Sequence, residues 1–274
     1  QPHGSLASID LNTGQLTSWN PNISSIRDML IHNGMLYVIT SNNLISYDLA
    51  TGNETPLNAQ INGTKKRVIE HNNSIYIGGS YGIKEYDIAG DSLTPFFLHN
   101  IDVESMCRKG DTLIFGGTFT HIGSMGNPWT LRTNLAAIDL NTSTLLPWNP
   151  APNDVVRALN VNDNKLYVGG FFTSINNINR SYTARFDTDN LQYINDNWYP
   201  NLNSSPRVFQ FQDDDIYIGG YHQYMGGKNR KNFLAIDLNT NLLCDLSFNV
   251  NDEIHDFVIK DSLLMFCGDF TQVN

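Results

Sequence analysis

Short apolar runs recur along the chain and are separated by turns rich in Asn, Asp and Gly. The clearest set of four is Val155–Val161, Leu166–Phe172, Thr183–Phe186 and Leu191–Trp198. Runs of this length, bounded by turn residues, are typical of β-strands. No stretch keeps a 3.6-residue apolar period, so we expect essentially no helix.

Two phrases repeat through the sequence. Leu-Tyr-Val-Gly-Gly at 166–170 has close or looser copies at Leu36–Thr40, Ile75–Gly79, Leu113–Gly117, Ile216–Gly220 and Leu264–Gly268. The second phrase, Leu-Ala-Ala-Ile-Asp at 135–139, places an aspartate in every unit, 38 to 52 residues apart, at Asp10, Asp48, Asp87, Asp139, Asp187 and Asp237. Four strands per repeat of ~40–50 residues is the pattern of a propeller blade.

The sequence therefore predicts an all-β, six-bladed β-propeller of four-stranded blades, in one domain spanning 1–274. The expected blades are 23–58, 61–98, 102–149, 154–201, 205–249, and 253–274 together with 1–20. The last blade combines a C-terminal half with an N-terminal half (2+2), which would close the ring and leave no free sheet edge. The alternative is a window of a larger ring with seven or eight blades.

The composition argues against several classes of protein. Seventeen basic residues against 27 acidic ones give a net charge of −10, which argues against nucleic-acid binding. No apolar run approaches ~18 residues, so we expect no membrane insertion. The three cysteines, Cys107, Cys244 and Cys267, are too few for a disulfide scaffold and are expected to be ordinary buried thiols.

Several repeated residues have structural explanations. The aspartates precede turns, where an Asp side chain accepts hydrogen bonds from backbone two residues on. The Gly-Gly pairs allow sheets to approach closely. Trp19, Trp148 and Trp198 fall at equivalent places and are expected to pack between neighbouring blades.

The phrases Leu-Tyr-Val-Gly-Gly-Phe-Phe-Thr at 166–173 and Leu-Ala-Ala-Ile-Asp at 135–139 resemble those of bacterial delta-60-type repeat propellers. More distantly, they are similar to quinoprotein-like propeller repeats. The first resemblance implies a secreted or cell-surface bacterial protein, with its signal peptide already removed. The second implies a redox enzyme or a protein-binding scaffold, but the chain has no adjacent cysteine pair, and we expect no cofactor.

In propellers of this kind the first strand of each blade lines the central channel. The residue at its entry is Arg27, Lys66, Glu104, Arg157, Arg207 or His255. The loops between second and third strands open on the same face, and they are long at 118–134, 173–182 and 221–232. Basic entry residues and aromatic or basic loop residues give the candidate ligand-binding set: Arg27, Lys66, Arg157, Arg207, His255, Trp129, Arg180, Tyr182, Tyr221, His222, Tyr224 and Arg230.

Aromatic rings beside arginines suit a glycan or another small anionic ligand, because rings stack on sugars and guanidinium groups bind carboxylates. A purely structural alternative is that each entry residue pairs with an acid of an inter-blade loop. The one metal hypothesis that the sequence supports is convergence of His3, His222 and His255.

The predicted function is a non-catalytic exported recognition propeller. The first alternative is a polysaccharide lyase or hydrolase with Arg157, Arg207, His222 and His255 near the reacting group. The second is a protein–protein scaffold, docked on the same face, within a larger surface protein. No catalytic triad or carboxylate pair can be assembled from the sequence.

Overall fold

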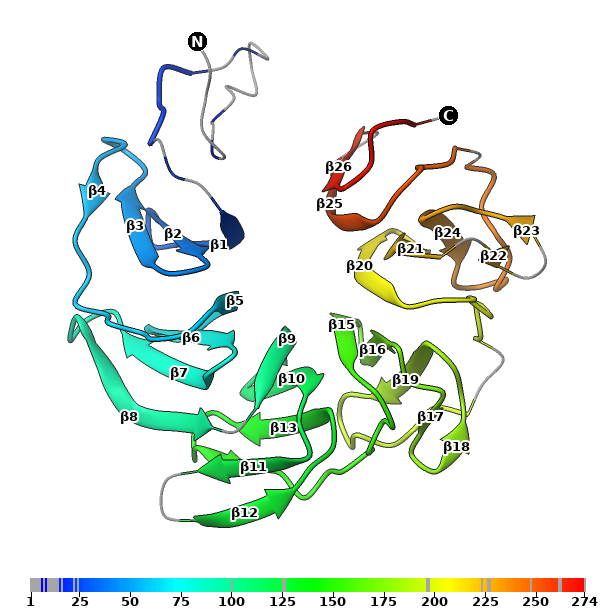
Figure 1. The fold of residues 1–274 in the computed structure, drawn as a ribbon, viewed down its shortest axis with the longest axis horizontal. Coiled ribbons are helices and arrows are strands. Elements are labelled where there is room, and N and C mark those ends of the chain that lie inside the picture. Colours follow the sequence, from blue (N-terminus) through cyan, green and yellow to red (C-terminus); the bar gives the residue numbers. More distant parts are fainter. Residues whose placement is uncertain are drawn as a thin grey trace. The chain divides into compact units, whose positions relative to one another are not determined.

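The computed structural model describes residues 6, 8, 15, 17–21, 23, 25–99, 101–124, 127–195, 198–222, 224–225, 228–246, 248–260 and 263–273. Within them the chain is all-β, with antiparallel sheets and no helix, as the repeat pattern predicts (Figure 1). No helix of the described part is long and apolar enough to cross a membrane. The chain divides into two compact units, residues 1–103 with 122–129, and residues 104–121 with 130–274.

The smaller unit holds two sheets. The first has the order β1-β2-β3-β4 and consists of β1 (Ile26–His32), β2 (Met35–Thr40), β3 (Leu44–Asp48) and β4 (Glu54–Thr55). The second has the order β12-β11-β8-β7-β6-β5 and consists of β5 (Lys65–His71), β6 (Ser74–Gly79), β7 (Gly82–Asp87), β8 (Ser92–His99), β11 (His121–Ser124) and β12 (Asn127–Leu131). The β11–β12 hairpin lies inside the segment 118–134, which the sequence predicts as a loop, and it extends the sheet by pairing Gly123 with His99.

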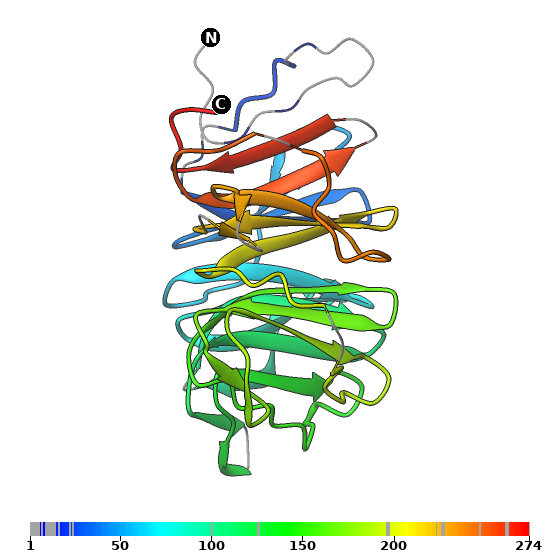
Figure 2. The same ribbon diagram turned by 90° about the vertical axis from the view of Figure 1, so that its right-hand side faces the viewer.

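The larger unit holds the remaining sheets, each following the preceding one along the chain. The first of them consists of β9 (Asp102–Lys109), β10 (Thr112–Thr118), β13 (Leu135–Asp139) and β14 (Thr144–Leu145). The next consists of β15 (Val156–Asn162), β16 (Lys165–Gly170) and β19 (Thr183–Asp187). It is followed by a sheet of β20 (Pro206–Gln212), β21 (Asp215–Gly220) and β24 (Phe233–Asp237), and then by the pair β25 (Ile254–Lys260) and β26 (Leu263–Gly268). Figure 2 shows these sheets lying face to face.

The long loops and the fourth strands differ from expectation. Two further loops contain hairpins of their own, β17 (Ser174–Ile175) with β18 (Ile178–Asn179), and β22 (Tyr224–Met225) with β23 (Lys228–Asn229). The fourth strand predicted at Leu191–Trp198 is reduced to one bridge, between Phe186 and Tyr193. Trp198 leaves the sheet and packs edge-on against the Tyr167 ring, at 5.1 Å between centroids, so burial of the indole replaces ladder pairing.

The core of the larger unit lies between consecutive sheets. Leu135 and Ala137 of β13 belong to the same buried cluster as Val156, Leu166 and Val168 of the next sheet. The first strands are neighbours, since β15 contacts both β10 and β20, and β20 contacts β25. Residues near the starts of these first strands are therefore brought together.

The aspartate turns are confirmed where the structure describes them. The Asp48 carboxylate accepts hydrogen bonds from the Ala50 and Thr51 amides, at 3.0 and 2.7 Å. Asp187 and Asp237 likewise accept hydrogen bonds from the backbone amides two and three residues further along the chain. Asp10 lies outside the described residues.

Candidate functional site

A β-bulge lies at the second residue of five first strands. The ladder register shifts between Ile26 and Asp28, and shifts in the same way in β5, β15, β20 and β25. The residues at the bulges are Arg27, Lys66, Arg157, Arg207 and His255. Because a bulged residue is left unpaired and its side chain is redirected, the bulges explain why these five side chains leave the sheets at the strand entries.

At four of the five bulges a glycine ends the second strand, whereas Thr40 stands at that place opposite the β1 bulge. A Cβ on Gly170 would lie 2.1 Å from the Val155 carbonyl oxygen, and one on Gly268 would lie 2.1 Å from that of Glu253. The second glycine therefore permits close approach of the backbone that leads into its own sheet's first strand. The first glycine faces the next sheet, since a Cβ on Gly169 would lie 2.5 Å from the Pro206 ring. The predicted sheet-on-sheet role thus holds for the first glycine and is wrong for the second.

Three of the five bulge side chains contact the residue that follows the second strand of their own sheet. Arg27 Nε donates to Ser41 Oγ at 3.1 Å. The Arg157 guanidinium lies over the Phe171 ring, 5.4 Å from its centroid. His255 Nε2 lies 3.0 Å from Asp269 Oδ2.

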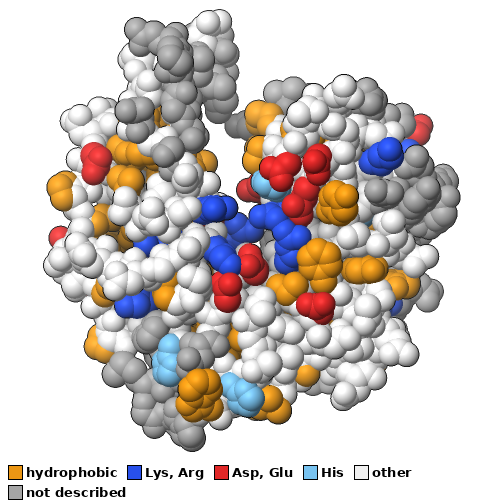
Figure 3. Space-filling view, viewed as in Figure 1, with side chains coloured by type: hydrophobic (Ala, Val, Ile, Leu, Met, Phe, Trp, Pro, Cys, Tyr) orange, Lys and Arg blue, Asp and Glu red, His pale blue; other side chains and the backbone are white. Residues whose placement is uncertain are grey.

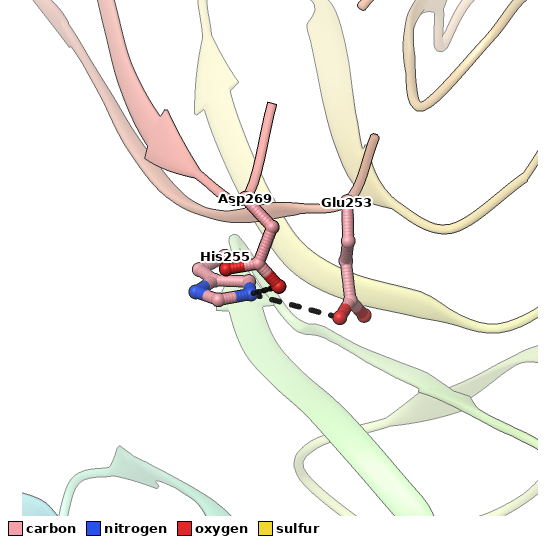
Figure 4. A group of neighbouring side chains, drawn as sticks. All are labelled: Glu253, His255 and Asp269. Atoms are coloured by element: carbon pink, nitrogen blue, oxygen red, sulfur yellow. Dashed lines mark hydrogen bonds and ion pairs between the residues drawn. The ribbon is translucent and has the colours of Figure 1, made fainter. Parts of the chain in front are cut away.

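Three of the predicted site residues converge on one carboxylate, Glu253. Arg157 Nη1 lies 3.2 Å from Oε1, Arg207 Nη1 lies 3.4 Å from Oε2, and His255 Nε2 lies 3.7 Å from Oε2. The Glu253 side chain is 16% exposed, and those of Arg157 and Arg207 are 19% and 25% exposed. Figure 4 shows Glu253, His255 and Asp269 directed toward one another, and Figure 3 shows basic and acidic side chains of the larger unit side by side near the starts of β15, β20 and β25.

The charges in this cluster are balanced. Burial, followed by repulsion from Arg207, lowers the pKa of Arg157, whereas Glu253 and Glu104 raise it. Because an arginine stays protonated in proteins, the effect is a cation held partly out of water beside a second cation. Glu253 is the carboxylate that both guanidinium groups contact.

Two exposed aromatic residues occupy equivalent places in neighbouring sheets, and the first of them lies under the Arg157 guanidinium. Phe171 follows β16 and Tyr221 follows β21, and their residues are 38% and 50% exposed. Their backbones are held alike, since the Phe171 amide donates to the Val155 carbonyl and the Tyr221 amide to that of Ser205. They give the edge of the larger unit an apolar surface next to guanidinium groups.

Three predicted residues lie in the smaller unit, each with a partner there. Arg27 binds Ser41, and Lys66 Nζ donates to Asp102 Oδ1 at 2.7 Å. Trp129 of β12 is 62% exposed and meets the His99 ring edge-on, at 6.4 Å between centroids.

Arg180 and Tyr182 have structural roles in the larger unit. Arg180 donates to the carbonyls of Thr183 and Trp198 and lies over the Tyr199 ring, 4.3 Å from its centroid. Tyr182 has a φ of 68°, the left-handed conformation that Asn134 and Asn232 adopt at the equivalent places, and its carbonyl accepts from Gly170.

The histidine trio does not assemble within the described residues. His222 is fully buried, and neither ring nitrogen has a hydrogen-bond partner among the described residues. The group of possible metal ligands around His255 consists of Glu253 and Asp269, without His222. His3 and the Tyr224 side chain lie outside what the structure describes, and Arg230 is half-buried after β23.

Sequence reasoning missed Glu253, Asp269 and Phe171. Asp269 and Phe171 could have been found by aligning the residue after the Gly-Gly position, where Tyr221 also stands. For Arg157 and Arg207 the structure agrees with the structural alternative, since both pair with an acid directly before the first strand β25, but the sequence does not single out Glu253 as that acid.

The chain matches no known protein family, and no curated protein matches it. Three solved structures are similar in fold. A chain of the mitotic checkpoint complex aligns with a TM-score of 0.65 at 12% identity, covering 91% of this chain and 73% of that one. The computationally designed Ika8 protein aligns with a TM-score of 0.60 at 14% identity, covering 93% and 71%.

The third is the extracellular domain of the putative one component system BT4673 from B. thetaiotaomicron. It aligns with a TM-score of 0.62 at 14% identity, covering 93% of this chain, while this chain spans 33% of that one. At these identities the similarity concerns the fold alone.

Proposed function

We propose that the chain folds as a six-bladed propeller whose face at Arg157 and Arg207 binds a carboxylate-bearing sugar. The proposal has two parts, the closure of the ring and the ligand. The resemblance of the repeated phrases to delta-60-type propellers supports a secreted or cell-surface bacterial protein.

The N-terminal segment supports closure through the way it packs in the smaller unit. Leu6 shares a buried cluster with Leu36 and Val38 of β2. Leu135 of β13 shares a cluster with Leu166 and Val168, which are the residues equivalent to Leu36 and Val38. Leu6 therefore packs on its neighbouring sheet as a third-strand residue does in the larger unit.

Trp19 and Trp148 also contact the neighbouring sheet in the same way. Trp19 meets Tyr47 edge-on at 5.4 Å, and Trp148 meets Phe186 edge-on at 5.2 Å. Tyr47 and Phe186 occupy the same place in their sheets, directly before the turn aspartate. Leu6 and Trp19 thus stand to the first sheet as Leu135 and Trp148 stand to the sheet that follows theirs.

Two apolar faces complete the argument. Met29 and Ile31 of β1 are 50% and 64% exposed, although the equivalent Leu159 and Val161 pack on the preceding sheet. These two residues line a groove of about 730 Å³ beside Trp19.

On β25 and β26, Val258 and Met265 are 52% and 50% exposed. They pair with each other as Asn160 pairs with Tyr167, and those two residues contact the following sheet through Phe209. Burying both faces against one another would remove several exposed apolar side chains from water, each worth about 1.5–3 kcal/mol when fully buried.

Closure can be tested by a disulfide. By analogy with the pairing of Tyr167 and Arg185, a closed ring places Met265 opposite Ser8. We expect a protein with Ser8→Cys and Met265→Cys, in a Cys267→Ser background, to form an intramolecular disulfide on mild oxidation, since opposed Cα atoms lie ~4.5–5.5 Å apart. The single-cysteine variants are the controls. Covalent dimers, or no disulfide, would contradict closure.

The ligand part rests on one observation, that Arg157 and Arg207 both lie against the Glu253 carboxylate, with the exposed Phe171 ring beside Arg157. Two guanidinium groups so placed provide charge-assisted hydrogen bonds for a carboxylate. Phe171 and Tyr221 provide ring faces for the apolar side of a sugar. A ligand carboxylate replaces Glu253 on the arginines, and the sugar ring stacks on the aromatic surface.

The test is calorimetric titration with glucuronate, and with glucose as the neutral match. We expect binding of glucuronate alone. It should weaken at least about tenfold in Arg157→Gln and Arg207→Gln, which corresponds to ~1.4 kcal/mol, and also in Phe171→Ala. Arg108→Gln is the matched control, because the Arg108 guanidinium donates to the Gly110 carbonyl in the turn after β9. Equal binding of both sugars, or unchanged affinity in both site arginine variants, would refute the ligand proposal.

A further inference from the structure

We propose that Glu253, His255 and Asp269 form a binding site for a divalent transition-metal ion, with Zn²⁺ as the best fit. One ligand atom from each side chain lies within 4.8 Å of the others. His255 Nε2 lies 3.0 Å from Asp269 Oδ2 and 3.7 Å from Glu253 Oε2 (Figure 4). Ligand atoms ~2.0–2.1 Å from a tetrahedral Zn²⁺ are about 3.3–3.4 Å apart, so these two separations bracket the required one.

The backbone sets the three ligands in place before any ion binds. Ile254, between Glu253 and His255, pairs with Gly268, and Asp269 follows directly. The bulge between Ile254 and Asp256 turns His255 out of the ladder toward that corner. Gly268 lets the Glu253 backbone approach, since a Cβ there would lie 2.1 Å from the Glu253 carbonyl. A small movement of side chains is therefore enough to surround an ion.

The electrostatics of the imidazole favour a cation at this place. Nε2 is the ring atom that faces both carboxylates. Its lone pair opposite two negative groups is repulsive unless hydrogen or a metal ion lies between them. The side chains of His255 and Asp269 are 36% and 63% exposed, so water can complete the coordination.

The neighbouring arginines limit the affinity and orient one ligand. Arg157 lies against Oε1 of Glu253, whereas Oε2 faces both Arg207 and His255. Such outer contacts fix the orientation of ligating carboxylates. The two positive charges also repel the ion, so we expect micromolar rather than nanomolar binding. One imidazole nitrogen among the donors favours Zn²⁺ over Mg²⁺ and Ca²⁺, which take oxygen ligands.

A histidine–carboxylate pair elsewhere provides the matched control. His32 Nδ1 lies 3.7 Å from Glu70 Oε2, at the same separation as His255 from Glu253. Among the described residues that pair is not part of a group of three possible ligands. A two-ligand pair should bind Zn²⁺ much more weakly.

The experiment is a calorimetric titration of the tag-free chain with ZnCl₂ and with MgCl₂, without sugar. A Cys267→Ser background removes the exposed thiol near β25, and thermal melting of each variant without metal checks the fold. We expect one Zn²⁺ per chain, affinity at least tenfold weaker in His255→Ala and in Asp269→Asn, and unchanged affinity in His32→Ala. Absence of binding, retention of affinity in both site variants, or equal affinity for Mg²⁺ would overturn the proposal. Because no sugar is present, such a result leaves the carboxylate proposal standing.

Discussion

The Arg157 guanidinium lies 3.2 Å from the Glu253 carboxylate, although the sheets that carry these residues are separated by the sheet of β20. Arg207 of that middle sheet reaches the other oxygen of the same carboxylate. Glu253 thus links three consecutive sheets at their first strands. It also occupies the place that we propose for a ligand carboxylate.

Glu253→Gln should therefore have opposite effects on stability and on binding. The substitution leaves two partly buried guanidinium groups facing each other, and we expect a loss of about 1–3 kcal/mol in the free energy of unfolding. Glucuronate should bind several-fold more tightly, because the internal competitor is neutral. Urea unfolding and calorimetric titration measure the two effects.

Asp102→Asn is the control for this prediction. It removes the partner of Lys66, in a pair whose side chains are 22% and 39% exposed, so the stability effect should be below about 1 kcal/mol. Glucuronate affinity should not change. Weaker glucuronate binding by Glu253→Gln would indicate that Glu253 itself contacts the ligand.

The all-β architecture could be predicted from sequence, and so could the positions of the first three strands of each repeat, because the repeat shows each of these strands in several copies. The turn aspartates are an example, since Asp48 and Asp187 make the same backbone contacts in different sheets. The entry residues could be predicted as well, although the bulge that turns their side chains out of the ladder is not visible in a one-dimensional pattern.

The close approach of the backbone at Gly170 predicts the effect of a substitution there. Gly170→Ala places a methyl group 2.1 Å from the Val155 carbonyl, so the bulge that presents Arg157 must shift. We expect a loss of about 2–4 kcal/mol in unfolding free energy, in the range of the largest single-residue effects. Gly110→Asn is the comparison, because Gly110 has a φ of 55° with open space around it and Asn tolerates this conformation. Similar stabilities of the two variants in urea would show that the Gly170 contact relaxes freely.

The loop hairpins and the cluster around Glu253 could not be predicted. Ser174 and Ile175 form only two ladder pairs with Asn179 and Ile178, too few for a periodic signal. The partner of Arg157 depends on how three sheets pack, which no spacing in the sequence encodes. The fourth strand expected at Leu191–Trp198 does not form a ladder. Tryptophan is common in strands, but Trp198 is buried against Tyr167 instead.

Cys267 reports on the proposed ring. The sequence predicts a buried thiol, but Cys267 is exposed, whereas the equivalent residues Gly169 and Gly219 lie against the first strand of the next sheet. Closure would cover the thiol, so we expect slow alkylation of Cys267 by iodoacetamide in the native protein. Deletion of residues 1–20 should speed it up. The buried Cys107, whose pKa is raised by burial, is the unreactive reference within the same chain. Rapid alkylation of Cys267 in the intact chain would argue against closure.

His222 should make the protein sensitive to acid. Burial lowers the pKa of His222 from 6.5 to about 4, so between these values the unfolded chain binds a proton that the folded chain does not. Stability from this residue is complete above pH 6.5 and falls as the pH drops toward 4, by ~1.4 kcal/mol per pH unit and about 3 kcal/mol in total. His222→Phe removes this dependence, and the equivalent places already hold Phe119, Phe172 and Phe270.

The variant should also gain about 1–2 kcal/mol at pH 7, because it no longer buries two ring nitrogens without partners. Urea unfolding of both proteins from pH 7.5 to 4.5 measures the difference, in which the contributions of the other titrating groups cancel. The two stability curves should diverge as the pH falls. Parallel curves would mean that His222 is solvated or hydrogen-bonded in solution, and that its low pKa is not maintained there.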